Sequence, residues 1–307
     1  MLRLLPFFLL LAFLITGCAG SFPFGAAGPE TPPPAEPLTV KVLDVGQGEA
    51  ILIRTPEQTV LLDTGDTSER QKLRAALNKE GVRTIDKLIV SHPHRDHLGG
   101  AETVFRYFQV KSVYDNGQIT TSKLYRDYLK TIQRKDLPYH SLKDGDTLDF
   151  GGGVTFHVLG PTEAMLAESE APGAKRDLNR NSLIARLTVG GFAMLLTADA
   201  GEEAEIGLLE RHPAEALRCQ VLKAGHHGSK TASSASFLRE TAPEWAVISC
   251  GAANEYHLPH PSTRQRFEAQ DIAFYRTDRN GTITVVTDGR TYTMTTERGA
   301  ANDATEN

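Results

Sequence analysis

Three histidines and one aspartate stand within six residues in the stretch Ser91-His92-Pro93-His94-Arg95-Asp96-His97. The short apolar run at 87–91 precedes them and predicts a strand that delivers these side chains to a loop. In extended backbone, residues two apart point the same way, so His92 and His94 face one side together. Imidazole and carboxylate groups are ligands for borderline divalent ions such as Zn²⁺ and Mn²⁺. The spacing therefore indicates a metal site rather than a chance polar loop.

The composition is that of a globular chain with a sizeable core. Of 307 residues, 40% are hydrophobic and 23% are charged, which excludes a disordered or collagen-like chain. This length allows two domains of about 150 residues or one larger α/β domain. With 33 Lys and Arg against 38 Asp and Glu, the net charge is -5. Any contact with nucleic acid must therefore use a local basic patch.

The amino terminus has the pattern of a bacterial lipoprotein signal. Arg3 precedes the apolar residues 4–15, and Ile15-Thr16-Gly17-Cys18 places small residues before a cysteine. The apolar run is shorter than the ~20 residues that a membrane-spanning helix needs, which favours a cleaved signal over an anchor. We predict removal of residues 1–17 and lipidation of Cys18. The protein would be exported and tethered by this lipid to the outer face of the cell membrane or to the outer membrane.

Composition divides the rest of the chain into a spacer, a folded domain and a tail. Residues 18–37 are rich in proline and glycine, which predicts an extended linker. Residues 38–298 are predicted to form one domain, and the polar residues 299–307 a disordered tail.

Strand and helix signals alternate through the folded part. Strands are predicted at 39–45, 49–55, 59–63, 87–91, 154–159, 182–189, 192–197, 219–224, 245–250, 273–275, 282–287 and 291–295. Helices are predicted at 69–80, 101–108, 122–135, 202–211, 234–241 and 262–270. Two groups of strands, each interleaved with helices, predict an α/β fold, an αββα sandwich of two mixed sheets with outer helices.

The motif His-x-His-x-Asp-His after a strand resembles the signature of the metallo-β-lactamase fold. Further motifs are similar to the ComEC-type branch, the exported hydrolase domain of competence membrane proteins. They are LDVGQGEA at 43–50, LLDTGD at 61–66, LTADA at 196–200 and LKAGHHGSKT at 222–231. The resemblance extends from about Leu38 to Thr287. It implies a binuclear metal-dependent hydrolase and says much less about the substrate.

The resemblance also implies a set of metal ligands. His92 and His94 would hold a first ion, and Asp96 and His97 would hold a second one together with a histidine at a strand end. Asp199 follows the apolar strand at 192–197 and would bridge the two ions. Its alternative role is an N-cap of the next helix.

Two adjacent histidines compete for the strand-end position. We prefer His226, because the strand at 219–224 would deliver the first histidine at its tip, although strand alternation alone cannot separate the pair. His227 would then contact the substrate or donate a proton. The predicted catalytic residues are thus Asp96, His227 and Lys230.

Many relatives have a further histidine on the first ion, and this chain offers none in that context. His157 stands mid-strand and is predicted to be a strand-surface or core residue. Asn179-Arg180-Asn181-Ser182 occupies the expected stretch instead. Asn181 either completes the metal shell, binds substrate, or is a turn residue. Fewer ligands would make the first ion easier to exchange, so the two divalent ions are Zn²⁺ or Mn²⁺.

Several polar residues are predicted around the ligands. The resemblance implies that Asp63 orients a ligand histidine, whereas its alternative is a turn aspartate. Ser229, Lys230 and Thr231 add hydroxyls and a cation, which suit phosphate better than a lactam; Lys230 can equally be a solvated surface lysine. His260 reaches the site from its rim or merely begins a helix. Cys219 and Cys250 either pair or lie in the core.

Four functions are compatible with these residues. A phosphodiesterase or nuclease is preferred, with DNA as the substrate that the branch suggests, although the net charge opposes it. Choline-phosphate or teichoic-acid esters of the cell wall compete with DNA. Lactone or lactam hydrolysis is weakened by the missing histidine. A non-catalytic surface lipoprotein that only binds is opposed by the intact cluster at 92–97.

Overall fold

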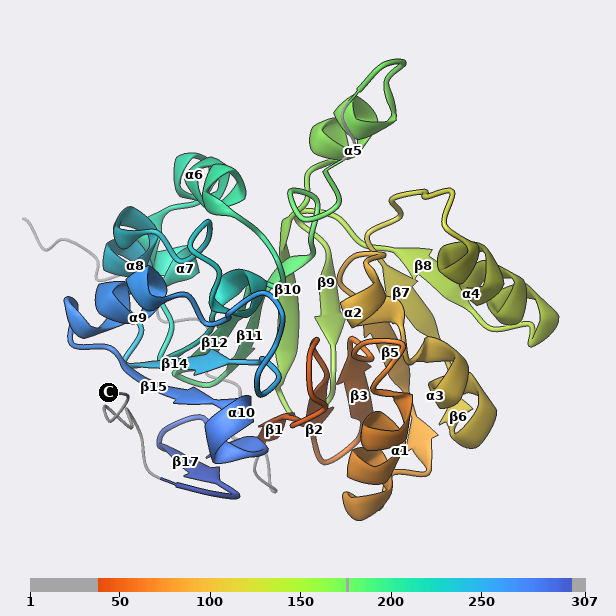
Figure 1. Ribbon diagram of the computed structural model, residues 1–307, viewed down its shortest axis with the longest axis horizontal. Coiled ribbons are helices and arrows are strands. Elements are labelled where there is room, and N and C mark those ends of the chain that lie inside the picture. The colour runs from red at the N-terminus through yellow and green to blue at the C-terminus, as the bar shows by residue number, and fades with distance from the viewer. Residues whose placement is uncertain (1–37, 175–176, 300–307) are drawn as a thin grey trace, which may run out of the picture. The chain divides into compact units, whose positions relative to one another are not determined.

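The computed structural model describes residues 38–174 and 177–299, and these residues belong to one compact unit. Figure 1 shows their arrangement. The predicted signal peptide, Cys18 and the linker lie outside the described residues, as does the predicted tail beyond Gly299.

One mixed sheet forms half of the interior. Its strands are β1 (Leu38–Val42), β2 (Ile51–Arg54), β3 (Thr59–Leu62), β5 (Lys87–Val90), β7 (Val113–Asp115), β8 (Tyr139–Ser141), β16 (Ile283–Thr287) and β17 (Tyr292–Thr296). They lie in the order β17-β16-β1-β2-β3-β5-β7-β8. Strands β3, β5, β7 and β8 are parallel to one another, and the other neighbours are antiparallel.

A second mixed sheet packs against the first. Its strands are β9 (Thr147–Asp149), β10 (Thr155–Gly160), β11 (Ile184–Val189), β12 (Phe192–Leu196), β13 (Val221–Lys223), β14 (Trp245–Ile248) and β15 (Ala273–Arg276). They lie in the order β15-β14-β13-β12-β11-β10-β9, with β12 to β15 parallel and β9 to β12 antiparallel. A small parallel ribbon joins β4 (Thr84–Ile85) to β6 (Gln109–Val110).

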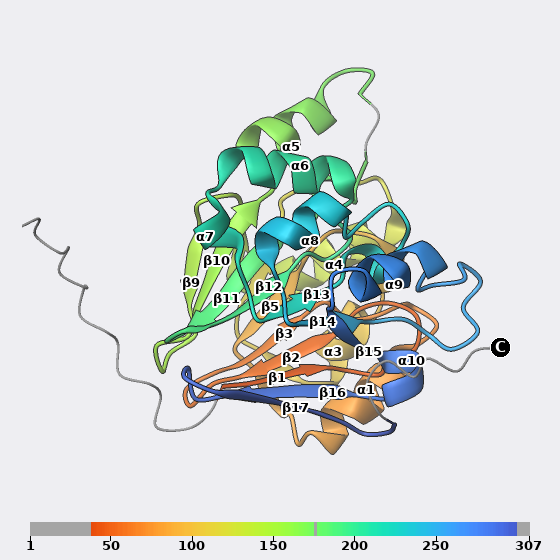
Figure 2. The ribbon, with the colours of Figure 1, turned by 90° about the vertical axis from the view of Figure 1, so that its left-hand side faces the viewer.

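The helices are α1 (Arg70–Lys79), α2 (Arg95–Leu98), α3 (Ala101–Tyr107), α4 (Lys123–Arg134), α5 (Glu163–Glu170), α6 (Glu202–Arg211), α7 (Ala214–Leu217), α8 (Ala235–Thr241), α9 (Pro261–Glu268) and α10 (Thr277–Asn280). Helices lie over the outer face of each sheet, whereas α5 projects away from the sandwich (Figures 1 and 2). None of these helices, in the part of the chain that the structure describes, is long and apolar enough to cross a bilayer.

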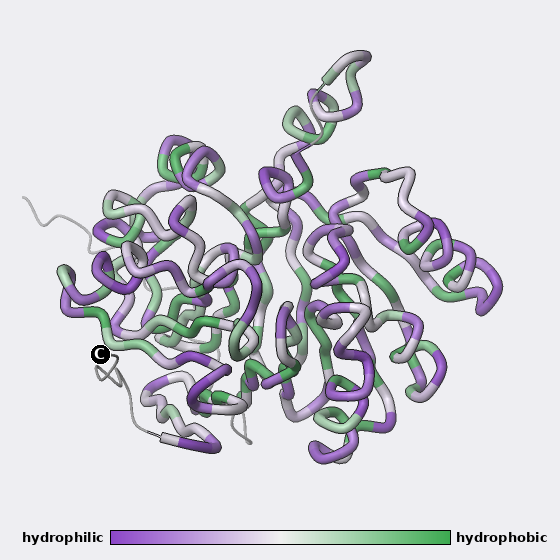
Figure 3. Tube along the Cα trace, viewed as in Figure 1, coloured by the Kyte–Doolittle hydropathy of each residue, from purple (hydrophilic) through white to green (hydrophobic). Residues whose placement is uncertain are grey.

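The apolar side chains form three clusters that follow the layers. Strand β1 alternates, so Leu38, Val40 and Val42 are buried between the sheets. Strand β5 is apolar on both faces: Ile89 joins the cluster between the sheets, whereas Leu88 packs under the helices α1, α3 and α4. The third cluster lies under α6, α8 and α9. In Figure 3 the strands are mostly green and the outer helical turns include much purple. The predicted αββα sandwich of two mixed sheets is confirmed.

The predicted strands and helices are present, and several further elements had no sequence signal. Strand β8 (Tyr139–Ser141) is exposed at all three residues, so it has no apolar alternation to detect. Helix α5 (Glu163–Glu170) buries only Ser169 and lacks an apolar stripe. Strand β7 (Val113–Asp115) is three residues long, which is too short for a periodic pattern.

Candidate active site

Four strand ends bring the predicted ligands together. Asp63 follows β3, the cluster at 92–97 follows β5, Asp199 follows β12, and the two adjacent histidines follow β13. These strands run in parallel within the two sheets, so their carboxyl ends meet at one edge of the sandwich. Ligand sites of α/β sheets lie at such edges.

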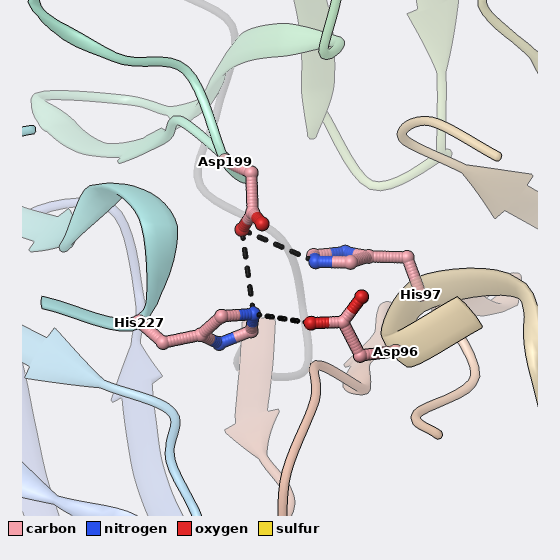
Figure 4. A group of neighbouring side chains, drawn as sticks. All are labelled: Asp96, His97, Asp199 and His227. Atoms are coloured by element: carbon pink, nitrogen blue, oxygen red, sulfur yellow. Dashed lines mark hydrogen bonds and ion pairs between the residues drawn. The ribbon is translucent and has the colours of Figure 1, made fainter. Parts of the chain in front are cut away.

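One group of potential ligands converges as Figure 4 shows. It contains Asp96, His97, Asp199 and His227, with one ligand atom of each lying within 4.8 Å of the others. His97 Nε2 is 3.1 Å from Asp199 Oδ1, and His227 Nε2 is 3.4 Å from the same oxygen. His227 Nε2 also lies 3.2 Å from Asp96 Oδ2. Two imidazoles and two carboxylates at this spacing match the ligand set of a divalent ion.

A second group shares Asp199 with the first. It contains His92, His94 and Asp199. His92 Nε2 lies 3.1 Å from His94 Nδ1 and 3.9 Å from Asp199 Oδ2. The two oxygens of Asp199 thus face different groups, which is the arrangement that a bridging carboxylate needs. Asp199 does not cap the following helix, because the N-cap of α6 is Gly201.

Two buried ligand atoms lack a hydrogen-bond partner among residues 38–174 and 177–299. They are His97 Nε2 and Asp199 Oδ1, which approach to 3.1 Å without hydrogen-bond geometry. Leaving a buried polar atom unpaired costs about 1–3 kcal/mol. A divalent ion between these atoms would satisfy both, so the donor set fits a metal.

The charges at the site favour the same interpretation. Burial raises the pKa of the Asp199 carboxyl, but His227 and His97 outweigh burial and hold that pKa well below its usual value. Burial lowers the pKa of the His97 imidazole, but Asp199 and Asp63 outweigh it and hold that pKa well above its usual value. The carboxylates and imidazoles around Asp199 are thus close enough to shift each other's pKa strongly.

Asp63 holds His97 in place from behind. Its Oδ2 lies 2.7 Å from His97 Nδ1, and its two oxygens accept hydrogen bonds from the Ser91 amide and hydroxyl at 2.7 Å. Because Nδ1 faces this carboxylate, Nε2 of His97 points towards Asp199. A carboxylate behind a ligand histidine fixes its tautomer and ring orientation. The structure thus places Asp63 where its predicted role requires, and also adds Ser91, which sequence reasoning missed.

The order that we predicted for the two adjacent histidines is reversed. Strand β13 ends at Lys223, and both histidines lie in the turn Gly225–Gly228 with φ of 48° and 54°, so strand alternation does not reach them. His227 is 1% exposed, and its Nδ1 donates to the Ser249 carbonyl at 2.8 Å, which leaves Nε2 facing the carboxylates. His226 is partly exposed instead. His227 therefore belongs with the candidate ligands, and His226 stands on the wall of the adjoining cavity.

The cavity beside the two groups has a volume of about 850 Å³. Its wall consists of Gln47, Asp66, Ser68, His94, Arg95, Asp96, Asn179, Asp199, His226, His227, Ser229, Asn254, Glu255, Tyr256 and Leu258. Ser229 lies on this wall as predicted.

Sequence reasoning missed two residues of the cavity wall, Asp66 and Tyr256. Asp66 accepts a hydrogen bond from Arg95 Nε at 2.8 Å, and Tyr256 is 57% exposed. Asp66 stands in the motif LLDTGD at 61–66, which supports the resemblance without placing this side chain on a cavity wall, and Tyr256 stands in a polar loop.

Three other predicted residues lie apart from the cavity wall. Lys230 is exposed, and the structure does not bring it to the site. His260 is the N-cap of α9, and its Nδ1 accepts from the Ser262 amide at 3.2 Å, so the helix-start alternative describes it. His157 lies on the surface of β10 with Nδ1 3.3 Å from Thr147 Oγ1, as predicted for a strand residue.

The stretch at 179–182 runs beside the first ligand group. The Leu183 amide donates to the Ser91 carbonyl at 2.9 Å, which ties this stretch to the loop of His92. Asn179 lies on the cavity wall with Nδ2 3.4 Å from His226 Nε2. Asn181 is 1% exposed, and its side-chain amide has no hydrogen-bond partner among the described residues. The stretch that carries both amides thus runs beside the first ligand group, and the predicted role of Asn181 stays a prediction.

A buried ion pair beneath the site has no counterpart in our predictions. Glu49 and Lys223 have no exposed side-chain surface, and Lys223 Nζ lies 2.5 Å from Glu49 Oε2. The Glu49 amide also donates to the Asp96 carbonyl at 3.0 Å. Both residues stand in motifs used for the resemblance. The available signal was the charge of Lys223 in the otherwise apolar strand β13.

The two cysteines among residues 38–174 and 177–299 are unpaired. Cys219 and Cys250 are free and buried. Of the two predicted alternatives, a disulfide or a place in the core, the second is confirmed. Burial raises the pKa of the Cys219 thiol to about 12. Neither thiol is placed to act as a nucleophile.

Comparison with known proteins agrees with the geometry. ComE operon protein 3 of Bacillus subtilis (strain 168) is 31% identical over 262 residues, which cover 80% of this chain and 32% of that protein. Competence protein ComA of Neisseria gonorrhoeae is 35% identical over 256 residues, which cover 83% of this chain and 33% of that protein. The chain thus spans about a third of the length of these curated relatives.

The fold and the family can be stated from two further comparisons. The crystal structure of a metal-dependent hydrolase of the β-lactamase superfamily superimposes with a TM-score of 0.51 at 15% identity, covering 78% of this chain and 95% of that chain. The family model described as the metallo-beta-lactamase superfamily matches residues 43–252, which include both ligand groups. The chain therefore belongs to the metallo-β-lactamase superfamily and to its ComEC-type branch.

Proposed function

We propose that this protein is a phosphodiesterase that uses two divalent ions. The observation that carries the proposal is the pair of ligand groups that share Asp199 on the wall of a large open cavity. Such ions, when bound, supply Lewis-acid activation of a water molecule and of the phosphoryl oxygens. The ions we expect are Zn²⁺ or Mn²⁺, with Mn²⁺ favoured where the first group has only three ligands.

The protein side chains would orient the substrate against these ions. His226 lies on the wall with Nε2 3.6 Å from Asp199 Oδ2, so it is placed to donate a proton to a leaving oxygen. Arg95, Ser229 and Asn179 on the same wall offer donors for anionic phosphate oxygens. A neutral lactam has no anionic oxygen to accept charge-assisted hydrogen bonds from these donors.

Nucleic acid is the phosphodiester that we prefer as the substrate. The relatives that match most of this chain are named as competence proteins, and the match includes both ligand groups. The chain covers only a third of those proteins, so a common substrate is part of the proposal.

A choline phosphodiester is the second candidate. Tyr256 is 57% exposed on the cavity wall, and Glu255 stands beside it. An aromatic face next to a carboxylate suits a quaternary ammonium group. This favours a wall-type phosphoester over a lactone or lactam as the alternative substrate.

A substrate panel tests the proposal. Purified protein is incubated with bis-p-nitrophenyl phosphate, a labelled DNA strand, p-nitrophenyl phosphocholine or nitrocefin, each with Mn²⁺, with Zn²⁺ or after chelation. We expect hydrolysis of phosphodiesters that stops with chelator and returns with metal. His226→Ala should lower turnover by roughly 10²- to 10⁴-fold with little change in metal content, as loss of a general acid does. Faster turnover of nitrocefin than of every phosphodiester would show that the substrate class is wrong.

We also propose that the protein is exported and held at a membrane by lipid on Cys18. The support is the short apolar run before Ile15-Thr16-Gly17-Cys18. Mass spectrometry of membrane-extracted protein should find a diacylglyceryl group on Cys18 as the first residue. A peptide that runs unmodified through Gly17 and Cys18 would contradict this.

A further inference from the structure

Positive charge is concentrated on three neighbouring helices. Helices α1, α3 and α4 together contain nine Lys and Arg but only two acidic residues, whereas the whole chain has 33 against 38. The three helices pack against one another over the outer face of the first sheet (Figure 1). The chain is therefore acidic overall and strongly basic on this one surface, which we call the basic helical face.

Most of the cations on this face lack acidic partners. Arg70, Lys72, Lys79 and Lys123 form ion pairs with nearby carboxylates. The other five are exposed and form no ion pair with any residue in 38–174 or 177–299: Arg74, Arg106, Arg126, Lys130 and Arg134. Uncompensated charges of one sign create a positive field at the surface, which favours an anionic partner.

A groove of about 320 Å³ runs between α4 and the other two helices. Cations from both sides line it: Arg70 on α1, and Lys123, Lys130 and Arg134 on α4. The three cations of α4 share one helical face, because their spacings are seven and four residues. Glu102 and Asp127 also line the groove and pair with Arg70 and Lys123, so Lys130 and Arg134 are its cations without an ion pair in the part of the chain that the structure describes.

The groove adjoins the candidate active site. Arg70 Nε donates to the Gly99 carbonyl at 2.8 Å, and Gly99 is two residues beyond His97. Arg95, in the same loop, stands on the cavity wall with 63% of its side chain exposed. Arg70 thus lines the groove and Arg95 the cavity wall, and they are paired with Glu102 and Asp66 respectively. A long anionic substrate that reached from the groove to the cavity would pass both guanidinium groups.

An exposed aromatic ring distinguishes this face from a simple charge patch. Tyr107, the last residue of α3, is 45% exposed. The Arg74 guanidinium lies 3.7 Å from its ring centroid and that of Arg106 lies 5.4 Å away. Aromatic rings among cations form stacking platforms for the bases of single-stranded nucleic acid. Polyglycerol phosphates and lipid headgroups have no base to stack.

We infer that the basic helical face binds single-stranded nucleic acid and leads it to the metal site. The groove cations contact the phosphates, and Tyr107 stacks on a base. This inference rests on the proposed phosphodiesterase function, because the strand that the face binds is the substrate of the adjoining cavity.

Binding of a fluorescein-labelled oligothymidylate, followed by anisotropy in EDTA, tests the face separately from catalysis. Lys130→Gln/Arg134→Gln should weaken binding at least tenfold at low salt. It should also reduce the slope of log affinity against log salt by about 1.4, since each contact to a single strand contributes about 0.7. Tyr107→Ala should weaken binding by on the order of tenfold. The matched control, Arg218→Gln/Arg239→Gln, removes two exposed arginines from the other helical layer and should change neither quantity.

Inorganic polyphosphate, which has charge but no bases, tests the nature of the partner. Tyr107→Ala should leave polyphosphate binding unchanged, and an equal loss for both polymers would overturn base stacking. Equal effects of the two double variants on oligothymidylate would overturn the face itself. Circular dichroism melting confirms that each variant is folded.

Turnover of bis-p-nitrophenyl phosphate separates this inference from the proposed function. The small substrate should be hydrolysed normally by the groove variant. If the wild-type protein hydrolyses it but the groove variant binds oligothymidylate normally, the inference fails and the function stands. If the face binds the strand and no phosphodiester is cleaved, the proposed function fails instead.

Discussion

Replacing Asp199 by alanine is expected to remove both metal ions and to abolish hydrolysis. Asp199 is 1% exposed, and its oxygens belong to both ligand groups. Without this carboxylate, two histidines remain in one group and three ligands in the other, and the negative charge that offsets two divalent ions is much reduced. Elemental analysis after desalting should fall from two metal equivalents per chain to none.

Two histidine variants sharpen this result. His227→Ala should lose one equivalent and His226→Ala none, because only His227 lies in a ligand group. The control Asp288→Ala removes a carboxylate from an exposed turn near the carboxyl end and should keep both ions. Two equivalents in Asp199→Ala would refute the bridge. Loss of metal from His226→Ala but not from His227→Ala would restore the order that the sequence suggested.

The ligand set illustrates how far sequence motifs reach. The cluster at 92–97 is contiguous, so its spacing alone predicted a metal site, and the apolar strand before Asp199 predicted where that carboxylate would stand. The assignment failed at His226 and His227 because it depended on strand alternation, whereas the chain leaves the strand at Lys223 for a left-handed turn. A left-handed turn of this kind depends on tertiary contacts, and the hydrophobic periodicity of a sequence contains no information about them.

The position of a side chain relative to distant segments of the chain was the hardest property to predict. Lys230 follows a glycine and a serine near the site, yet its side chain is exposed and away from the cavity wall. Lys223 was passed over as a strand residue, although it forms an ion pair across 174 positions of the chain with Glu49. Local sequence gives the type of element, whereas the partner of a buried charge follows only from the packing of the two sheets.

This ion pair leads to the second large effect. Lys223→Met is expected to lower the free energy of unfolding by about 3–5 kcal/mol, because it leaves the Glu49 carboxylate buried without a positive partner. Screening by solvent cannot reduce this cost, since neither side chain is exposed. Urea unfolding of the metal-free protein measures the change without any contribution from bound ions.

The double variant Glu49→Gln/Lys223→Met separates lost charge from lost packing. Removing both charges should recover most of the stability, since a buried ion pair is often worth little more than a neutral pair of similar volume. The Glu49 amide holds the Asp96 carbonyl, and Lys223 precedes the turn that bears His227, so the pair also positions both ends of one ligand group. We therefore expect Lys223→Met to weaken metal binding, and the double variant to restore it in part.

If Lys223→Met and the double variant were both as stable as the wild type, the pair would have no structural role. If stability returned in the double variant while metal affinity stayed at the level of Lys223→Met, the charges themselves would be required at the site, beyond their part in holding the two sheets together.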